Sequence, residues 1–278
     1  NYKVKFANES TGVPQLTEPQ IGKYAIEIID DLQEQNRIAN ILINMDNLIN
    51  SLKKTIEKKQ KVFEATTQEL LNGTNKIYKW EKVKLGDIGE FTGNGVDKKI
   101  IKDEKEIRLL NFMDIMRLNF IYKNVSRHFV TASKEKIHRC SIKKGDIFLT
   151  PSSETRLDIG ISAVAMEDIE DLVYSYHIVR FRPIITMDLL FRAYIFKNKK
   201  FLNQASTMCE GSGKRYVCSN KKFASFELEI PMDIREQKNI GIKLSTMEKE
   251  LDMLKNKLMK YKQIKRGIIE DLLIGKVR

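Results

Sequence analysis

Short polar loops rich in arginine, lysine and small hydroxyl residues interrupt the middle of this chain. "SSETR" follows an apolar run, "SRH" follows the polar stretch "YKNV", and "GSGKR" precedes another apolar segment. Lysine and arginine neutralise phosphates, while arginine, asparagine and serine form hydrogen bonds with base edges. These residue types therefore predict contacts with nucleic acid. The candidate nucleic-acid-binding residues are Asn94, Lys98, Arg127, His128, Ser153, Thr155, Arg156, Lys214 and Arg215.

No constellation for catalysis or metal binding accompanies these loops. His128, His138 and His177 lack the spacing of metal ligands, and we expect His177, inside an apolar run, to be a core residue. "GSGKR" lacks the leading glycine and the final hydroxyl residue of a phosphate-binding loop, so a turn before a strand is the better interpretation. The sequence therefore predicts a protein that is not an enzyme and holds no metal or cofactor.

The chain carries an excess of positive charge that favours a polyanionic partner. Its 278 residues include 49 Lys and Arg against 37 Asp and Glu, which gives a net charge of +12 and a pI of about 9.4. Residues 76–229 contribute 28 basic and 20 acidic residues, or +8. This charge predicts nucleic acid first and an acidic membrane surface second. An ordinary solvated basic surface is the alternative.

Length and cysteine usage set broader limits. The chain is long enough for one large domain or two ordinary ones, and we find no apolar run that could span a bilayer and no signal peptide. The three cysteines have no CxxC spacing and leave one unpaired, which indicates a reducing, cytoplasmic compartment. The first residue is Asn1 rather than Met, which leaves a fragment, a proteolysed chain and a natural half-subunit as alternatives.

Two stretches that must position the loops repeat each other without a gap. "EQNRIANILINMDNLINSLKK" begins at Glu34 and "EQKNIGIKLSTMEKELDMLKN" begins at Glu236, a constant offset of 202. The agreement continues on both sides, as in "YAIEIIDDLQEQ" and "FELEIPMDIREQ". It favours duplication over two unrelated amphipathic helices. The repeated unit is predicted to be a turn, a short strand and a helix of about 40 residues that ends near Gly73 or Gly275.

Apolar residues in both stretches recur at alternating steps of four and three. Such a heptad period is typical of a coiled coil, although Lys59, Thr66 and Lys265 interrupt it. The predicted seam consists of Ile38, Leu42, Met45, Ile49, Leu52, Ile56, Ile240, Leu244, Met247, Leu251, Leu254 and Leu258.

The segment between the repeats has the pattern of a mixed α and β domain. "IRLLNFMDI", "SIKKGDIFLT", "ISAVAM" and "SYHIVRFRP" read as strands, and "KKFASFELEIP" as the closing strand. "MDLLFRAYIFKNKKFLNQAS" has helical spacing. We therefore expect an α+β fold with a curled mixed sheet.

The order of these pieces resembles the specificity subunits of type I restriction–modification systems. The resemblance covers nearly the whole chain and rests on "WEKVKLGDI", "KKGDIFLT", "SSETRLDIG", "FELEIPMDIREQ", both helices and their endings "ELLNG" and "DLLIG". It implies a globular mixed-sheet target-recognition domain flanked by two long helices that pair as an antiparallel coiled coil. The expected parts are residues 1–27 as the tail of a first recognition domain, 28–75 as helix 1, 76–229 as the recognition domain, and 230–278 as helix 2.

The resemblance also implies function and partners. A specificity subunit is not catalytic; it binds double-stranded DNA and positions methyltransferase and restriction subunits on a bipartite site. S-adenosylmethionine, ATP and magnesium are then expected on those partners only, and a half-subunit would form a homodimer. We expect the Glu34–Gln35 and Glu236–Gln237 helix entries to help dock the methyltransferase. The alternative is a coiled-coil scaffold whose basic domain binds another protein or an anionic surface.

Overall fold

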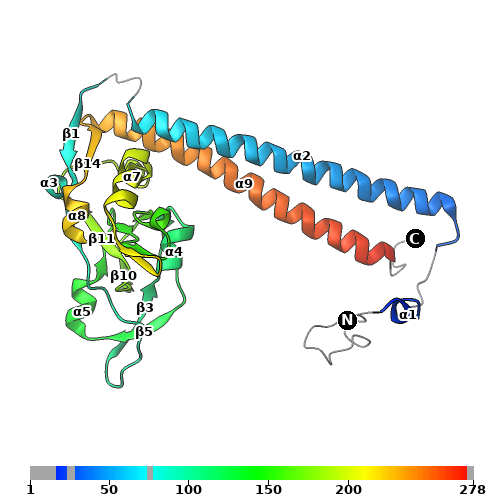
Figure 1. Cartoon of the computed structure of the whole chain (residues 1–278), viewed down its shortest axis with the longest axis horizontal. Coiled ribbons are helices and arrows are strands. Elements are labelled where there is room, and N and C mark those ends of the chain that lie inside the picture. The colour runs from blue at the N-terminus through cyan, green and yellow to red at the C-terminus, as the bar shows by residue number, and fades with distance from the viewer. Residues whose placement is uncertain (1–16, 24–28, 74–77, 274–278) are drawn as a thin grey trace. The chain divides into compact units, whose positions relative to one another are not determined.

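A computed structural model describes residues 17–23, 29–73 and 78–273 (Figure 1). The chain divides into two compact units, residues 1–54 with 256–278 and residues 55–255. Most of residues 1–27, the predicted tail of a first recognition domain, lies outside the described residues. The described part of this stretch contains the short helix α1 (Glu18–Ile21). No helix in the described part is long and apolar enough to cross a membrane.

The two repeated stretches form long helices of equal length. Helix α2 (Leu32–Leu71) and helix α9 (Ile234–Leu273) each contain 40 residues, and their first and last residues differ by 202 in both cases (234 − 32 and 273 − 71). The sequence offset is therefore reproduced at both helix ends.

The repeat extends to the hydrogen bonds that begin each helix. Asp31 Oδ1 accepts the backbone N–H of Gln33 at 2.8 Å, and Asp233 Oδ1 accepts that of Arg235 at 2.7 Å. The side-chain amide of Gln35 donates to Ile29 O at 2.5 Å, and that of Gln237 donates to Pro231 O at 2.8 Å. The aspartate bonds satisfy a backbone N–H that a helix start leaves free, and the glutamine bonds tie each helix to the segment before it.

Residues of the heptad pattern are the less exposed positions of both helices. Ile49, Ile240, Leu244 and Leu251 are buried, and the other eight predicted seam residues are partly buried. The lysines that interrupt the pattern pair with carboxylates of the other helix: Lys59 with Glu250 at 2.8 Å, and Lys265 with Asp46 at 2.6 Å. Lower numbers in α2 thus match higher numbers in α9, so the helices are antiparallel.

The segment between the long helices contains short strands and helices. The strands are β1 (Trp80–Lys84), β2 (Gly89–Thr92), β3 (Lys105–Leu110), β4 (Phe120–Ile121), β5 (Phe129–Ala132), β6 (Ser141–Ile142), β7 (Ile147–Leu149), β8 (Ser152–Ser153), β9 (Ser162–Ala165), β10 (Ile169–Tyr174), β11 (Val179–Pro183), β12 (Glu210–Ser212), β13 (Arg215–Val217) and β14 (Glu227–Pro231). The helices are α3 (Leu85–Ile88), α4 (Phe112–Arg117), α5 (Lys134–Arg139), α6 (Leu189–Arg192), α7 (Lys199–Met208) and α8 (Asn220–Ser225), with 3-10 turns at Arg156–Asp158 and Ile195–Lys197.

These strands form mixed sheets, which confirms the α+β fold class. The largest have the orders β2-β11-β7-β9-β4 and β5-β3-β10-β6; β4–β9 and β3–β10 are parallel, while the other pairs are antiparallel. β1 pairs with β14, so the two ends of the domain meet. One core gathers buried phenylalanines around the five-stranded sheet, and a second packs around Leu109, Val173 and Tyr174.

Three sequence-based element assignments were wrong in detail. "NFMDI" is helix α4 rather than strand, because Asn111 and Asp114 form a capping box at its start. "KKFASFELEIP" begins with α8, which Ser219 caps, before β14. The predicted helix over "MDLLFRAYIFKNKKFLNQAS" is broken into α6, a 3-10 turn and α7, where Asn198 caps α7.

The start of α9 is bonded to the domain between the long helices, which corrects our expectation of a docking surface there. The Trp80 indole N–H donates to Glu236 Oε1 at 3.0 Å, and Gln237 Oε1, in a residue only 2% exposed, accepts the backbone N–H of Asp188 at 2.8 Å. Gly241 lets α6 approach closely, because an added Cβ would lie 2.7 Å from Phe191 N. Glu236 and Gln237 therefore anchor their own domain.

Candidate nucleic-acid interface

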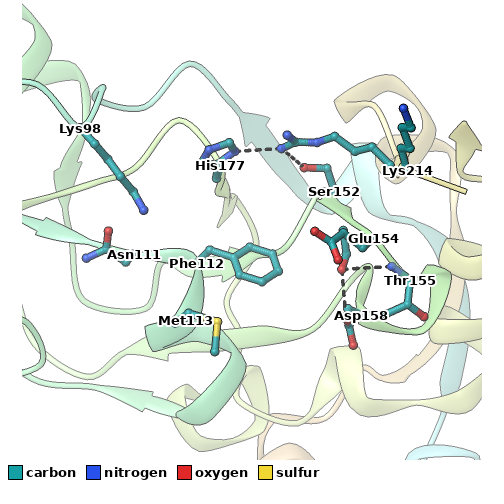
Figure 2. Close-up of a pocket in the computed structure, with 12 residues that line it drawn as sticks. Lys98, Asn111, Phe112, Met113, Ser152, Glu154, Thr155, Asp158, His177 and Lys214 are labelled. Atoms are coloured by element: carbon teal, nitrogen blue, oxygen red, sulfur yellow. Dashed lines mark hydrogen bonds between the residues drawn. The ribbon is translucent and has the colours of Figure 1, made fainter. Parts of the chain in front are cut away.

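A cavity of about 500 Å³ lies where several loops of the domain between the long helices converge (Figure 2). Lys98 and Lys214 lie on opposite sides of it in this view, with Phe112 and Glu154 between them. Its lining mixes cations, carboxylates, amides and hydroxyls, the groups that bind phosphates and base edges. The lining residues are Lys98, Asn111, Phe112, Met113, Ser152, Ser153, Glu154, Thr155, Asp158, His177, Lys214 and Arg215.

A β-hairpin carries two of these cations. Strands β12 and β13 pair through Gly211 opposite Tyr216, and β13 in turn pairs with β8. Gly211 has a φ of +126°, and a Cβ there would lie 2.1 Å from Arg215 O, so a side chain cannot be accommodated. The hairpin therefore holds Lys214 and Arg215 beside the β8 residues of the cavity.

Hydrogen bonds fix the loop that follows β8. Ser153 Oγ donates to Asp158 Oδ2 at 2.9 Å, and Thr150 Oγ1 donates to Asp158 O at 2.5 Å. The Thr155 hydroxyl accepts the backbone N–H of Leu157 at 3.3 Å. Glu154 and Thr155 are consequently presented as exposed side chains on a fixed turn.

The structure brings five of the nine predicted DNA-binding residues together in this cavity. They are Lys98, Ser153, Thr155, Lys214 and Arg215.

The other four do not line it. His128 is adjacent, because its Nδ1 lies 3.2 Å from Oδ1 of the lining residue Asn111. Arg127 is exposed. Asn94, with a φ of +59°, is exposed too, and its carbonyl accepts from Arg139. Arg156 points into the domain.

The Arg156 guanidinium is bonded to the C-terminal end of α7. Nη1 donates to Ser206 O at 3.1 Å and to Cys209 O at 3.2 Å, and the guanidinium lies 4.4 Å from the centre of the Tyr216 ring. We therefore expect Arg156 to stabilise the hairpin and its neighbouring turn, whereas the sequence alone indicated a base contact.

Arg156→Ala is expected to lower the free energy of unfolding by about 1–2 kcal/mol, since two carbonyls and a ring lose their partner. Chemical denaturation measures this, and Arg127→Ala, at an exposed position, should change stability by less than about 0.5 kcal/mol. If Arg156→Ala leaves stability unchanged but abolishes binding to the DNA site, Arg156 contacts DNA, as the sequence alone predicted.

Within residues 17–23, 29–73 and 78–273, no group of three or more His, Cys, Asp or Glu could hold a metal ion. The three cysteines are free and buried, and burial raises the pKa of the Cys218 thiol to about 12.

Residues 78–264 match the family model of the type I restriction modification DNA specificity domain. The chain belongs to this family. It is the DNA specificity subunit of a type I restriction–modification system, a non-catalytic component of that complex.

Relatives agree with this assignment over most of the chain. The chain is similar to the type I restriction enzyme MjaVIII specificity subunit of Methanocaldococcus jannaschii, with 24% identity over 99% of this chain and 67% of that protein.

Two crystal structures share the fold. They are the HsdS subunit from Thermoanaerobacter tengcongensis (TM-score 0.55, 14% identity, 99% of this chain and 68% of that one) and the S subunit of a type I restriction–modification system from M. genitalium (TM-score 0.56, 15% identity, 96% and 68%).

Sequence reasoning missed several lining residues of this specificity subunit. Asn111, Phe112 and Met113 were assigned to a strand, although the Asn-x-x-Asp spacing that caps α4 was visible. His177 was expected in the core; it is partly buried and lines the cavity. No signal along the chain marked Glu154 and Asp158, whose roles depend on the fold of the turn.

Proposed function

We propose that this specificity subunit recognises one half of a bipartite DNA site through the cavity between Lys98, Glu154 and the β12–β13 hairpin. The convergence of three cations from segments more than a hundred residues apart supports this proposal most directly. Lys98 and Lys214 neutralise phosphates, while Arg215, Asn111 and Glu154 offer donors and acceptors to base edges. Glu154 accepts from the amino group of cytosine in this scheme.

Methylome sequencing tests the proposal in cells that carry the subunit with its methyltransferase. The variant Lys98→Ala/Lys214→Ala/Arg215→Ala should reduce methylation of the parental site by about 100-fold, given about 1–3 kcal/mol for an arginine contact and the added loss of phosphate binding. The control Lys134→Ala/Lys200→Ala/Lys221→Ala removes the same charge from exposed positions outside the cavity. Equal loss in both variants would assign the effect to total charge instead of the cavity.

The partners in this proposal are methyltransferase and restriction subunits, which bring S-adenosylmethionine and ATP with magnesium. Exposed apolar residues lie at intervals of seven and fourteen residues on α2, at Ile41, Leu48 and Val62. They support helix docking, because these side chains are 44–49% exposed and lie off the seam. Native mass spectrometry with the methyltransferase should show two of its subunits on an assembly with two recognition domains. One subunit at saturation would contradict this.

The first copy of the helix entry supports a second recognition domain in the working assembly. Gln35 repeats the backbone bond of Gln237 but is exposed, whereas Gln237 is covered by its domain. Ala39 and Ile43 are exposed as well, and their counterparts Gly241 and Ser245 are buried. The proposed second domain covers this part of α2, either within one longer protein or through a homodimer.

A further inference from the structure

The guanidinium of Arg215 is held between two side-chain acceptors in the cavity wall. Its Nη2 lies 2.9 Å from Ser152 Oγ and 3.0 Å from His177 Nδ1, the two bonds drawn at His177 and Ser152 in Figure 2. A guanidinium only donates, so both hydrogens of Nη2 are used by these contacts. Ser152 comes from β8 and His177 from the turn before β11, so two separate segments fix one arginine.

This geometry sets the state of the His177 ring. Because Nδ1 accepts from Arg215, it is unprotonated, and the neutral ring carries its proton on Nε2. Burial lowers the pKa of His177 below its ordinary 6.5, and the charges of Arg215 and Lys98 lower it further. The ring also contacts that of Tyr176, with centroids 3.8 Å apart, while the His177 backbone N–H donates to Ser175 Oγ.

No other charged group that the structure describes around the cavity would compensate for the loss of the His177–Arg215 hydrogen bond. Lys98 and Lys214 line it beside Arg215, opposed by Glu154 and Asp158. Asp158 accepts from Ser153, and within the described residues no carboxylate forms an ion pair with His177. A proton on Nδ1 would therefore remove the acceptor and add a cation next to Arg215.

We propose that His177 and Ser152 are positioning residues that fix Arg215 for recognition of a single base, with neutral His177 as the required state. This rests on the proposed function, because it deepens the role of the same cavity. With Nη2 occupied, Arg215 keeps Nε and Nη1 as donors; a two-pronged contact with guanine through Nη2 requires release of one partner. Arg215 accordingly discriminates through Nη1 while it is held.

The first test is independent of DNA. The chain has three histidines, so their ring resonances can be assigned in 15N-histidine-labelled full-length protein with one His→Asn variant each. We expect the Nε2–H tautomer for His177, a pKa below 6.5, and a rise of that pKa in Arg215→Ala. An Nδ1–H tautomer, or a pKa that does not respond to Arg215→Ala, would overturn the contact.

The second test measures base discrimination. Once methylome sequencing has given the parental site, the subunit in complex with its methyltransferase is titrated with duplexes that carry each single-base change. His177→Leu and Ser152→Ala should lose about tenfold discrimination at the same base pair as Arg215→Ala, because about 1.4 kcal/mol corresponds to a factor of ten. His177→Asn, whose Oδ1 replaces the Nδ1 acceptor, should retain it.

The pH dependence of base discrimination distinguishes these variants further. As the pH is lowered through the pKa that the first test measures for His177, discrimination should fall in the parent and stay constant in His177→Asn. His138→Asn, changed at an exposed histidine, should behave as the parent. Parental discrimination in His177→Leu would overturn the positioning role. If Arg215→Ala itself leaves every base pair unaffected, the proposed function of the cavity fails even when the histidine contact is present.

Discussion

Glu248→Ala is expected to lower the free energy of unfolding by about 3 kcal/mol, a large share of the 5–15 kcal/mol typical of a domain. Glu248, on α9, accepts from the Tyr194 hydroxyl at 2.7 Å and from the Asn119 amide, and Asn119 in turn accepts from the Lys197 ammonium. Burial lowers the pKa of Lys197, and the Glu248 carboxylate opposes that shift. Alanine would leave the Tyr194 hydroxyl without its acceptor and Lys197 without the carboxylate that offsets its burial.

The matched control is Glu250→Ala, two residues further along the same helix. Glu250 pairs with Lys59 at 2.8 Å, but its side chain is 50% exposed, so solvent screens the interaction and the expected loss is below about 1 kcal/mol. Denaturant titrations of both variants provide the comparison. Equal losses would show that the Glu248 network does not hold the recognition domain on α9.

Lengthening both long helices by one heptad is expected to change the DNA target. If two recognition domains are held by the paired helices, seven added residues, about 10 Å of helix, should widen the gap between half-sites by about three base pairs. The ion pairs Asp46–Lys265 and Lys59–Glu250 place Leu52 opposite the region of Leu258, so insertion after these two residues keeps the apolar seam in register.

Methylome sequencing measures the spacer directly. The half-site sequences should persist, because the cavity is untouched, and we expect the rotation of the half-sites by about a third of a turn to weaken binding. An insertion of three residues instead of seven breaks the seam and serves as the control for disruption. An unchanged spacer at full activity in the heptad variant would show that these helices do not set the distance.

The long helices could be predicted in detail because their information is local. The heptad spacing and the Asp-x-x-x-Gln entries recur at one offset, and the structure repeats both ends at that offset. The secondary structure of the recognition domain was harder to predict, because tertiary contacts determine the type and the ends of its short helices and strands. "NFMDI" has the apolar content of a strand, yet its capping box makes it a helix.

The candidate site was partly predictable for the same reason. Residue type and loop position were enough to select Lys98, Lys214 and Arg215, which the fold brings together. They could not show that Arg156 turns inward to α7 or that His177 turns outward to Arg215. Those directions depend on partners about 40 to 50 residues away in sequence.

The anchor at the start of α9 has an evolutionary consequence. Gln237 accepts a hydrogen bond from the main-chain N–H of Asp188, and Glu236 accepts one from the Trp80 indole N–H on the domain's first strand. The cavity is lined by residues of other loops. Mutations that alter the preferred base sequence need not touch the joint, and a main-chain amide survives almost any substitution. Evolution can therefore change the preferred base sequence through the cavity loops while the joint between the domain and α9 stays constant.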